Sequence, residues 1–147
     1  MDPEQDYSYW TALTVRVGDL NYGGHLGNDR VLLFFHEARV RFLRVIGVSE
    51  KDIGEGVSLT QTEAAVSYFN EAFLGELLSV GVHFSSFSRV RFRVDYRILR
   101  PSDGAPIAAG HTVMAAFDYA VRRPKKIPLS FIQRVNNYQS RESGGTN

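Results

Sequence analysis

The segment between residues 28 and 47 constrains the fold more than any other part of the chain. Asn28 and Asp29 are residue types that cap helix starts, and Gly47 is typical of a helix end, so we predict a helix from about residue 28 to residue 46. The polar side chains of this helix form one stripe: Arg30, Glu37, Arg41 and Arg44. A helix that is apolar around most of its circumference is usually buried among other elements. The rest of the chain is therefore expected to wrap around it.

Five strands are predicted to surround this helix. They cover residues 7–17, 57–69, 77–87, 88–99 and 107–119. In the clearest of them, RVRFRVDYRI, apolar residues alternate strictly with charged ones, which gives one dry face and one cationic face. One helix followed by a run of antiparallel strands predicts a sheet curled around that helix. Because an open sheet leaves unpaired edge strands, we expect at least a dimer.

The composition excludes several classes of function. The 147 residues suffice for one domain, which we place at residues 1–136, with a flexible polar tail at residues 137–147. A net charge of +1 argues against a nucleic-acid partner, and the absence of cysteine excludes disulfides, cysteine-zinc sites and thiol nucleophiles. The first ten residues lack the apolar core of a signal peptide, and the predicted helix carries too many arginines to span a membrane. We therefore expect a cytoplasmic protein.

The most informative stretch is RVGDLNYGGHLGNDRVLLFFHEARVRFL, residues 16–43. It resembles the hotdog-fold acyl-CoA thioesterases, in particular the group of 4-hydroxybenzoyl-CoA thioesterase, whose pattern is R-x-x-D-x-D-x-x-G-H-x-x-N followed by an apolar helix with Glu-Ala-Arg. The residues in register with that pattern are Arg16, Asp19, Gly24, His25, Asn28, Glu37, Ala38 and Arg39. Two later stretches, VSYFNEAFLGELLSV and GHTVMAAFDYAVRRPKKIP, resemble the family's second and last strands. The likeness covers about residues 10 to 130.

This resemblance implies both a fold and a class of substrate. The fold would be the α+β hotdog fold, an antiparallel sheet wrapped around one long central helix. The substrate would be an acyl thioester of CoA or of an acyl-carrier protein, hydrolysed by a homodimer or homotetramer without a cofactor or a metal ion.

One position departs from the family pattern. The second aspartate of the pattern, usually assigned as nucleophile or general base, is Asn21 in this chain. An amide does not ionise near neutral pH, but Asn21 can hold a water molecule with its carbonyl oxygen or bind the substrate with its NH₂ group. The resemblance therefore implies the fold and a thioester ligand more firmly than it implies the usual catalysis.

Thioester hydrolysis also needs donors for the developing oxyanion and a group that accepts a proton. The backbone N–H groups of Gly27 and Asn28 lie at the predicted helix start, where they lack helical partners. Asn28 could instead be only a cap. His25 titrates in the useful pH range and Asp19 is a nearby acid, although either could simply organise the loop. The catalytic candidates are Asn21, His25, Asn28 and Asp19.

Further candidates lie outside this loop. His36 and Glu37 on the helix are secondary choices for proton transfer, although Glu37 can equally pair with arginines of its own helix. Six basic residues could meet the phosphates of CoA: Arg122, Arg123, Lys125, Lys126, Arg89 and Arg91. The alternatives for these residues are a solvated strand face, a subunit contact or an ordinary basic loop. His83 and His111 stand alone in strands and do not suggest a metal site.

Three functions remain open on the sequence. The leading hypothesis is hydrolysis of an acyl thioester through water held by Asn21 and an oxyanion hole at the helix start. The second is an enoyl-thioester hydratase or dehydratase, because DLNYGGH resembles D-x-N-P-x-H, although it lacks the proline and is longer before His25. The third is a module that binds acyl-CoA without cleaving it.

Overall fold

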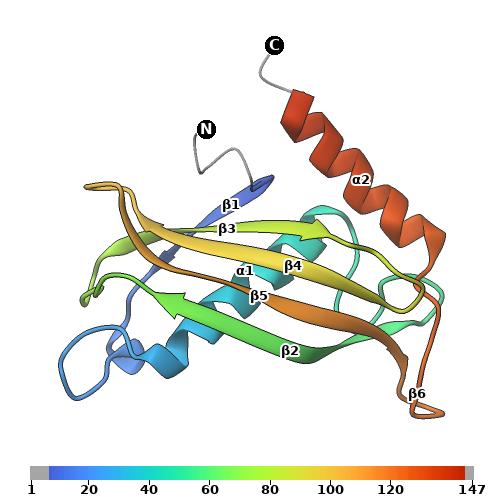
Figure 1. The fold of residues 1–147 in the computed structure, drawn as a ribbon, viewed down its shortest axis with the longest axis horizontal. Helices are drawn as coiled ribbons and strands as arrows, with labels where there is room; N and C mark the ends of the chain where they lie inside the picture. Colours follow the sequence, from blue (N-terminus) through green and yellow to red (C-terminus); the bar gives the residue numbers. More distant parts are fainter. Residues whose placement is uncertain (1–6, 145–147) are drawn as a thin grey trace.

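The computed structural model describes residues 7–144 of the chain. One antiparallel sheet of six strands curls over helix α1 (Val31–Val45), and a second helix, α2 (Leu129–Gly144), lies at one end of the sheet (Figure 1). The strands are β1 (Tyr9–Thr14), β2 (Ser58–Tyr68), β3 (Leu77–Ser85), β4 (Arg91–Arg100), β5 (Ala105–Asp118) and β6 (Arg123–Pro124). Their order across the sheet is β1-β3-β4-β5-β2, and β6 pairs with the end of β5. The predicted antiparallel sheet around one long helix is confirmed.

The alternation in β4 decides which of its faces meets the helix. Phe92, Val94, Tyr96 and Ile98 are buried, whereas Arg91 and Arg93 on the opposite face are exposed. Because side chains of a strand alternate between its two faces, the period-two pattern places these four apolar residues in the core.

Helix α1 begins differently from the prediction. A short 3₁₀ helix, Asn28–Arg30, comes before Val31, and no side chain makes a capping hydrogen bond at the start of either helix. The expected caps by Asn28 and Asp29 are therefore wrong. The chain instead enters the helix through a 3₁₀ turn closed by the backbone, in which Arg30 N–H donates to Gly27 O over 2.9 Å.

The burial of α1 is one-sided within a single chain. Its core-facing residues follow helical spacing: Val31, Phe34, Phe35, Ala38, Arg39, Phe42 and Leu43. Leu33 and Val45 on the other side are about half exposed. Arg39, a charged residue within the buried face, donates to Glu50 and to the phenol of Tyr96.

Helix α2 was not expected from the sequence. The prediction placed a flexible tail from residue 137, but residues 137–144 continue this helix, and residues 145–147 lie outside the described residues. Phe131 and Val135 of α2 are fully buried, and Gln139 is 8% exposed. Packing of a few residues against the sheet therefore stabilises a helix whose overall composition is polar.

Strand β2 forms one edge of the sheet. It is 11 residues long, and residues 61–65 in its middle are exposed. A bulge at Thr62 interrupts its pairing with β5. A long, uncovered edge of this kind is able to pair with another strand.

No helix among residues 7–144 is both long enough and apolar enough to cross a membrane.

Candidate active site

The loop that carries Asn21 and His25 is a tight hairpin. Asn21 N–H donates to His25 O over 2.9 Å, and Gly24 N–H donates to Asn21 O over 3.1 Å. Gly24 has a φ of 78°, in the left-handed region that favours glycine, which explains why a glycine stands at the turn. The hairpin brings the two side chains together on one side of the loop.

A second loop, residues 69–76 between β2 and β3, lies against this hairpin. Leu26 N–H donates to Ala72 O over 2.7 Å, and His25 forms an isolated β-bridge with Phe73. These backbone contacts join two segments that lie far apart in the sequence.

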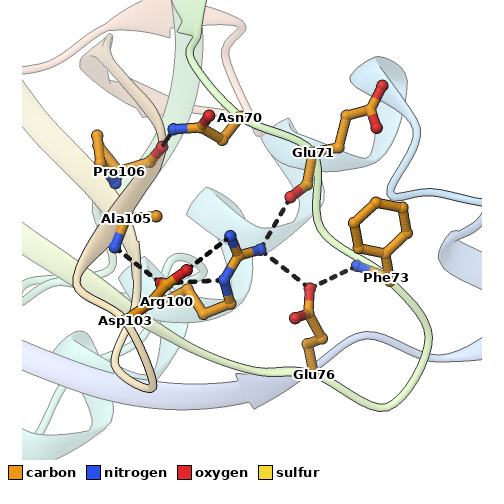
Figure 2. A network of polar contacts seen from close by, with 8 residues as sticks. All are labelled: Asn70, Glu71, Phe73, Glu76, Arg100, Asp103, Ala105 and Pro106. Carbon is orange, nitrogen blue, oxygen red and sulfur yellow. Dashed lines mark hydrogen bonds and ion pairs between the residues drawn. The ribbon is translucent and has the colours of Figure 1, made fainter.

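Arg100, at the end of β4, holds the second loop in place (Figure 2). Its guanidinium donates to Glu71 O over 3.0 Å, to Glu76 Oε1 over 3.1 Å, and to both carboxylate oxygens of Asp103 over 3.1 Å. Hydrogen bonds from Arg100 keep the pKa of Asp103 below its usual value. At the start of the loop, the Asn70 amide donates to Pro106 O over 2.7 Å. The loop is therefore fixed by charged and polar contacts.

The two loops border an open pocket of about 430 Å³ at the start of α1. Its lining residues are Asn21, His25, Leu26, Asn28, Tyr68, Phe69, Asn70 and Glu71. Three of the four predicted catalytic residues, Asn21, His25 and Asn28, thus lie in the same pocket. The fourth, Asp19, does not line it.

Asn21 is oriented by its own loop. Its Oδ1 accepts hydrogen bonds from the backbone N–H groups of Gly23, over 2.9 Å, and of His25, over 3.4 Å. The carbonyl oxygen that was expected to hold water is therefore already bound to the backbone. The Nδ2 amide lies 3.4 Å from His25 Nδ1, so the NH₂ group is the part of Asn21 that can reach a ligand.

Each ring nitrogen of His25 lies near an oxygen acceptor. Its Nδ1 is 3.2 Å from Leu26 O, and its Nε2 is 3.6 Å from Glu71 Oε1. The imidazole side chain is 29% exposed and the carboxylate side chain is 63% exposed, so both are accessible from the pocket.

The start of α1 offers one of the two predicted oxyanion donors. Gly27 N–H donates to Asp19 O over 2.9 Å, so this predicted donor is already satisfied within the loop. The backbone N–H of Asn28 has no acceptor among the described residues, and Tyr68 donates its hydroxyl proton to Asn28 O over 2.9 Å. Of the two predicted donors, only Asn28 N–H therefore remains available to a ligand among the described residues.

Asp19, His36 and Glu37 lie around a different cleft, of about 530 Å³, between β1 and α1. Asp19 is 3% exposed and accepts from the backbone and the side chain of Arg16. His36 contacts Glu50 at 2.9 Å, and Glu37 pairs with Arg41. The structure does not bring these three predicted residues together with Asn21.

Glu50 belongs to a polar network that crosses the core. Burial alone would raise its pKa, but hydrogen bonds from His36 and Arg39 lower the pKa of Glu50 to about 2. Arg39 also donates to Tyr96 over 2.8 Å, and Tyr96 shares a 2.7 Å hydrogen bond with Thr112. The buried guanidinium of Arg39 therefore has several hydrogen-bond acceptors, one of which is the charged carboxylate of Glu50.

The six basic residues predicted to bind CoA gather at the opposite end of the sheet. They lie on the β5–β6 hairpin or at the start of β4, where Ile127 N–H donates to Arg89 O. Tyr68 pairs with Ala108, beside the pocket, whereas Ser58 pairs with Phe117, beside the hairpin. The length of β2 thus separates the two places within one chain by roughly 30 Å (Figure 1).

A metal site is not evident in the part of the chain that the structure describes. No group of three or more histidine, aspartate and glutamate side chains among residues 7–144 is arranged to hold a metal ion.

A family model described as the thioesterase-like superfamily matches residues 15–135 of the chain. The chain belongs to this superfamily. A 1,4-dihydroxy-2-naphthoyl-CoA hydrolase of Synechococcus elongatus is 24% identical over 126 residues, which are 84% of this chain and 90% of that protein.

Solved structures of the same kind share the fold. A 1,4-dihydroxy-2-naphthoyl-CoA thioesterase from Synechocystis superposes with a TM-score of 0.79 at 22% identity, over 86% of this chain and 94% of its own. A thioesterase from Thermus thermophilus, solved with coenzyme A and zinc, has a TM-score of 0.79 at 24% identity, over 92% and 97%. The predicted hotdog fold is confirmed.

In this member of the thioesterase-like superfamily, the pocket also contains the carboxylate of Glu71, which the sequence did not predict as a site residue. The signal was its place in VSYFNEAFLGELLSV, but only the contact between the two loops puts it beside His25.

Proposed function

We propose that this protein hydrolyses an acyl-CoA thioester to a free acid and CoA in the pocket between the two loops. The observation that carries the proposal is that Asn21, His25 and Asn28 line one pocket at the start of α1, and that the backbone N–H of Asn28 has no acceptor among the described residues. The names of the superfamily relatives, which include CoA-thioester hydrolases, support the same reaction.

The pocket offers the components that hydrolysis requires. The thioester oxygen would lie against Asn28 N–H, where the helix start favours negative charge, and one such donor is typically worth about 3–4 kcal/mol of barrier. The NH₂ group of Asn21 would donate to the attacking water and fix its position, and His25 would accept the proton. Asn21 thus positions the water molecule without acting as a base.

The proposal includes a second copy of the chain. If β2 pairs antiparallel with β2 of a partner, the Ser58 end of one strand lies beside the Tyr68 end of the other. The partner's basic hairpin would then approach the pocket that the chain's own hairpin cannot reach. This arrangement would let cationic side chains meet the CoA phosphates at the mouth of the pocket.

A panel of acyl-CoAs tests the proposed function. Release of free thiol from at least one of them is the expected result. A change in enoyl absorbance without thiol release would instead indicate a hydratase, and saturable binding without either would indicate a binding module. The same acyl groups on an acyl-carrier protein, compared at equal concentration, distinguish the two carriers.

A further inference from the structure

We propose, resting on the hydrolysis proposed above, that Glu71 supplies the carboxylate that Asn21 lacks. Glu71 acts as a positioning residue: it stabilises the charged form of His25 while that ring takes the proton of the attacking water. The carboxylate of the catalytic pair would thus come from the loop after β2, and not from the loop before α1.

The contacts in the pocket support this pairing. Glu71 Oε1 lies 3.6 Å from His25 Nε2, and both residues line the pocket with Asn21. Of the eight lining residues, only His25, Glu71 and the phenol of Tyr68 have a group that ionises. Any proton exchange with a water in this pocket near neutral pH therefore involves His25 or Glu71.

The contacts of Nδ1 bear on which ring nitrogen of His25 accepts the proton of the attacking water. Leu26 O, at 3.2 Å, can only accept a hydrogen bond, whereas Asn21 Nδ2, at 3.4 Å, can only donate one. We assign the proton to Nδ1 as part of this proposal, because Leu26 O can then accept it. Nε2 is then the nitrogen that accepts a proton, and it is the one that faces Glu71. Once protonated, the ring donates from Nδ1 to Leu26 O and carries its charge close to the Glu71 carboxylate, which lies 3.6 Å from Nε2.

The backbone of Glu71 is fixed while its carboxylate remains available. Arg100 holds Glu71 O, and Leu26 holds the neighbouring Ala72 O. Figure 2 shows the Glu71 carboxylate directed away from Arg100, whose charge is taken up by Glu76 and Asp103. A carboxylate held in this way can stabilise an imidazolium without itself being neutralised by the arginine.

The step balances with water as the only co-reactant. The water oxygen forms a bond to the thioester carbonyl carbon, and one of its protons passes to His25 Nε2. The carbonyl electrons move to the oxygen at Asn28 N–H. When they return, the C–S bond breaks and the imidazolium gives its proton to the leaving thiolate, so that acid and thiol result and His25 is again neutral.

Glu71→Gln tests the inference, with Glu55→Gln as the matched control, because Glu55 is exposed and lies outside the pocket. We expect Glu71→Gln to lower kcat about 10–100-fold with little change in KM. The acid limb of its pH–rate profile should also move to lower pH, because the imidazolium loses its counter-charge. Glu71→Asp should recover part of the rate.

Two double variants separate a catalytic pair from a merely structural contact. Glu71→Gln in a His25→Ala background should cost little beyond His25→Ala alone, because the carboxylate acts through the ring. Asn21→Asp in a Glu71→Gln background should have a kcat at least about five-fold higher than Glu71→Gln alone, because it returns a carboxylate to the side of His25.

The outcomes also separate this inference from the proposed function. An active wild type whose Glu71→Gln variant keeps its rate within about two-fold and an unchanged pH profile overturns the inference alone. Fully additive effects of His25→Ala and Glu71→Gln overturn it as well. A wild type that releases no thiol overturns the proposed function and, with it, the part assigned to Glu71.

Discussion

The side-chain amide of Gln139 makes two hydrogen bonds with the backbone of Phe84. Gln139 Oε1 accepts from Phe84 N–H over 2.8 Å, and Nε2 donates to Phe84 O over 2.9 Å. Strand β1 pairs with β3 only as far as Val82, so helix α2 provides the partner where the neighbouring strand has ended. The side chain of Gln139 thus forms the hydrogen bonds that a neighbouring strand would otherwise provide to Phe84.

Gln139→Leu should therefore lower the free energy of unfolding by about 2–4 kcal/mol, because it leaves a buried donor and a buried acceptor unpaired. Urea unfolding monitored by circular dichroism measures the change. Gln133→Leu, at an exposed position of the same helix, is the control and should differ from wild type by less than about 0.5 kcal/mol. Equal stability of the two variants would contradict a structural role for the contact.

Asn21 gives a second prediction. Asn21→Ala should lower kcat about 10–1000-fold, because it removes a positioned NH₂ group and an acceptor for two backbone N–H groups. Asn21→Asp keeps the acceptor and adds an acid, so it should be as active as wild type or more active, with a new acid limb in the pH–rate profile.

Tyr22→Ala is the control for this loop, because Tyr22 is fully exposed and does not line the pocket. If Asn21→Ala hydrolyses every tested acyl-CoA as fast as wild type, the position of the water does not depend on Asn21.

The basic hairpin gives a prediction about binding. Neutral replacements of Arg122, Arg123, Lys125 and Lys126 should raise KM for acyl-CoA about 10-fold and weaken its salt dependence, with kcat nearly unchanged. Arg44→Gln removes an exposed cation from the end of α1 and should leave KM as it is. An unchanged KM in the hairpin variant would mean that the CoA phosphates bind elsewhere, with Arg89 and Arg91 as the next candidates.

The proposed exchange of hairpins between subunits can be tested by complementation. A chain with Asn21→Ala and a chain with the neutral hairpin should each be impaired, yet their heterodimer contains one pocket with Asn21 and a basic hairpin facing it. With random pairing, about a quarter of all sites in the mixture are intact. The mixture should therefore show about a quarter of the wild-type activity when it is measured at low substrate concentration. Activity no greater than the mean of the two parents, or a strictly monomeric mass in solution, would contradict the arrangement.

The pKa of Glu50 gives a prediction about acid stability. The pKa is about 2 in the folded protein and 4.5 is the ordinary value, so the ionised form stabilises the fold above about pH 4.5. This contribution is lost as the pH falls from 4.5 toward 2. Glu50→Gln should therefore be less stable than wild type by about 2–4 kcal/mol at pH 7, because Arg39 loses its counter-charge.

The stability difference between wild type and Glu50→Gln should shrink through the same pH window. Denaturant unfolding at several pH values measures it, and Glu55→Gln should show no such trend. A difference that stays constant from pH 7 to pH 2 would mean that ionisation of Glu50 does not contribute to stability.

Much of the fold was predictable because periodicity is a local property. Alternation in β4 identifies a strand with one buried face without knowledge of its neighbours, and apolar residues at helical spacing in α1 likewise identify a helix with a buried face. The loop motif likewise predicted that Asn21, His25 and Asn28 belong together, because they are close in the sequence and the glycine turn brings them to one side.

The sequence alone determined helix α1, strands β1 to β5 and the presence of Asn21 where the family pattern has an acid. The tertiary structure alone decided which distant residues meet. Strand order and register placed Glu71 beside His25, buried Arg39 against Glu50 and Tyr96, and set the basic hairpin at the far end of the sheet. The same packing stabilised α2, since Gln139 gains its partner only where β1 stops. The physical reason is that propensity and periodicity act over a few residues, whereas hydrogen bonds and charges act over a few ångströms between segments that only the completed sheet brings together.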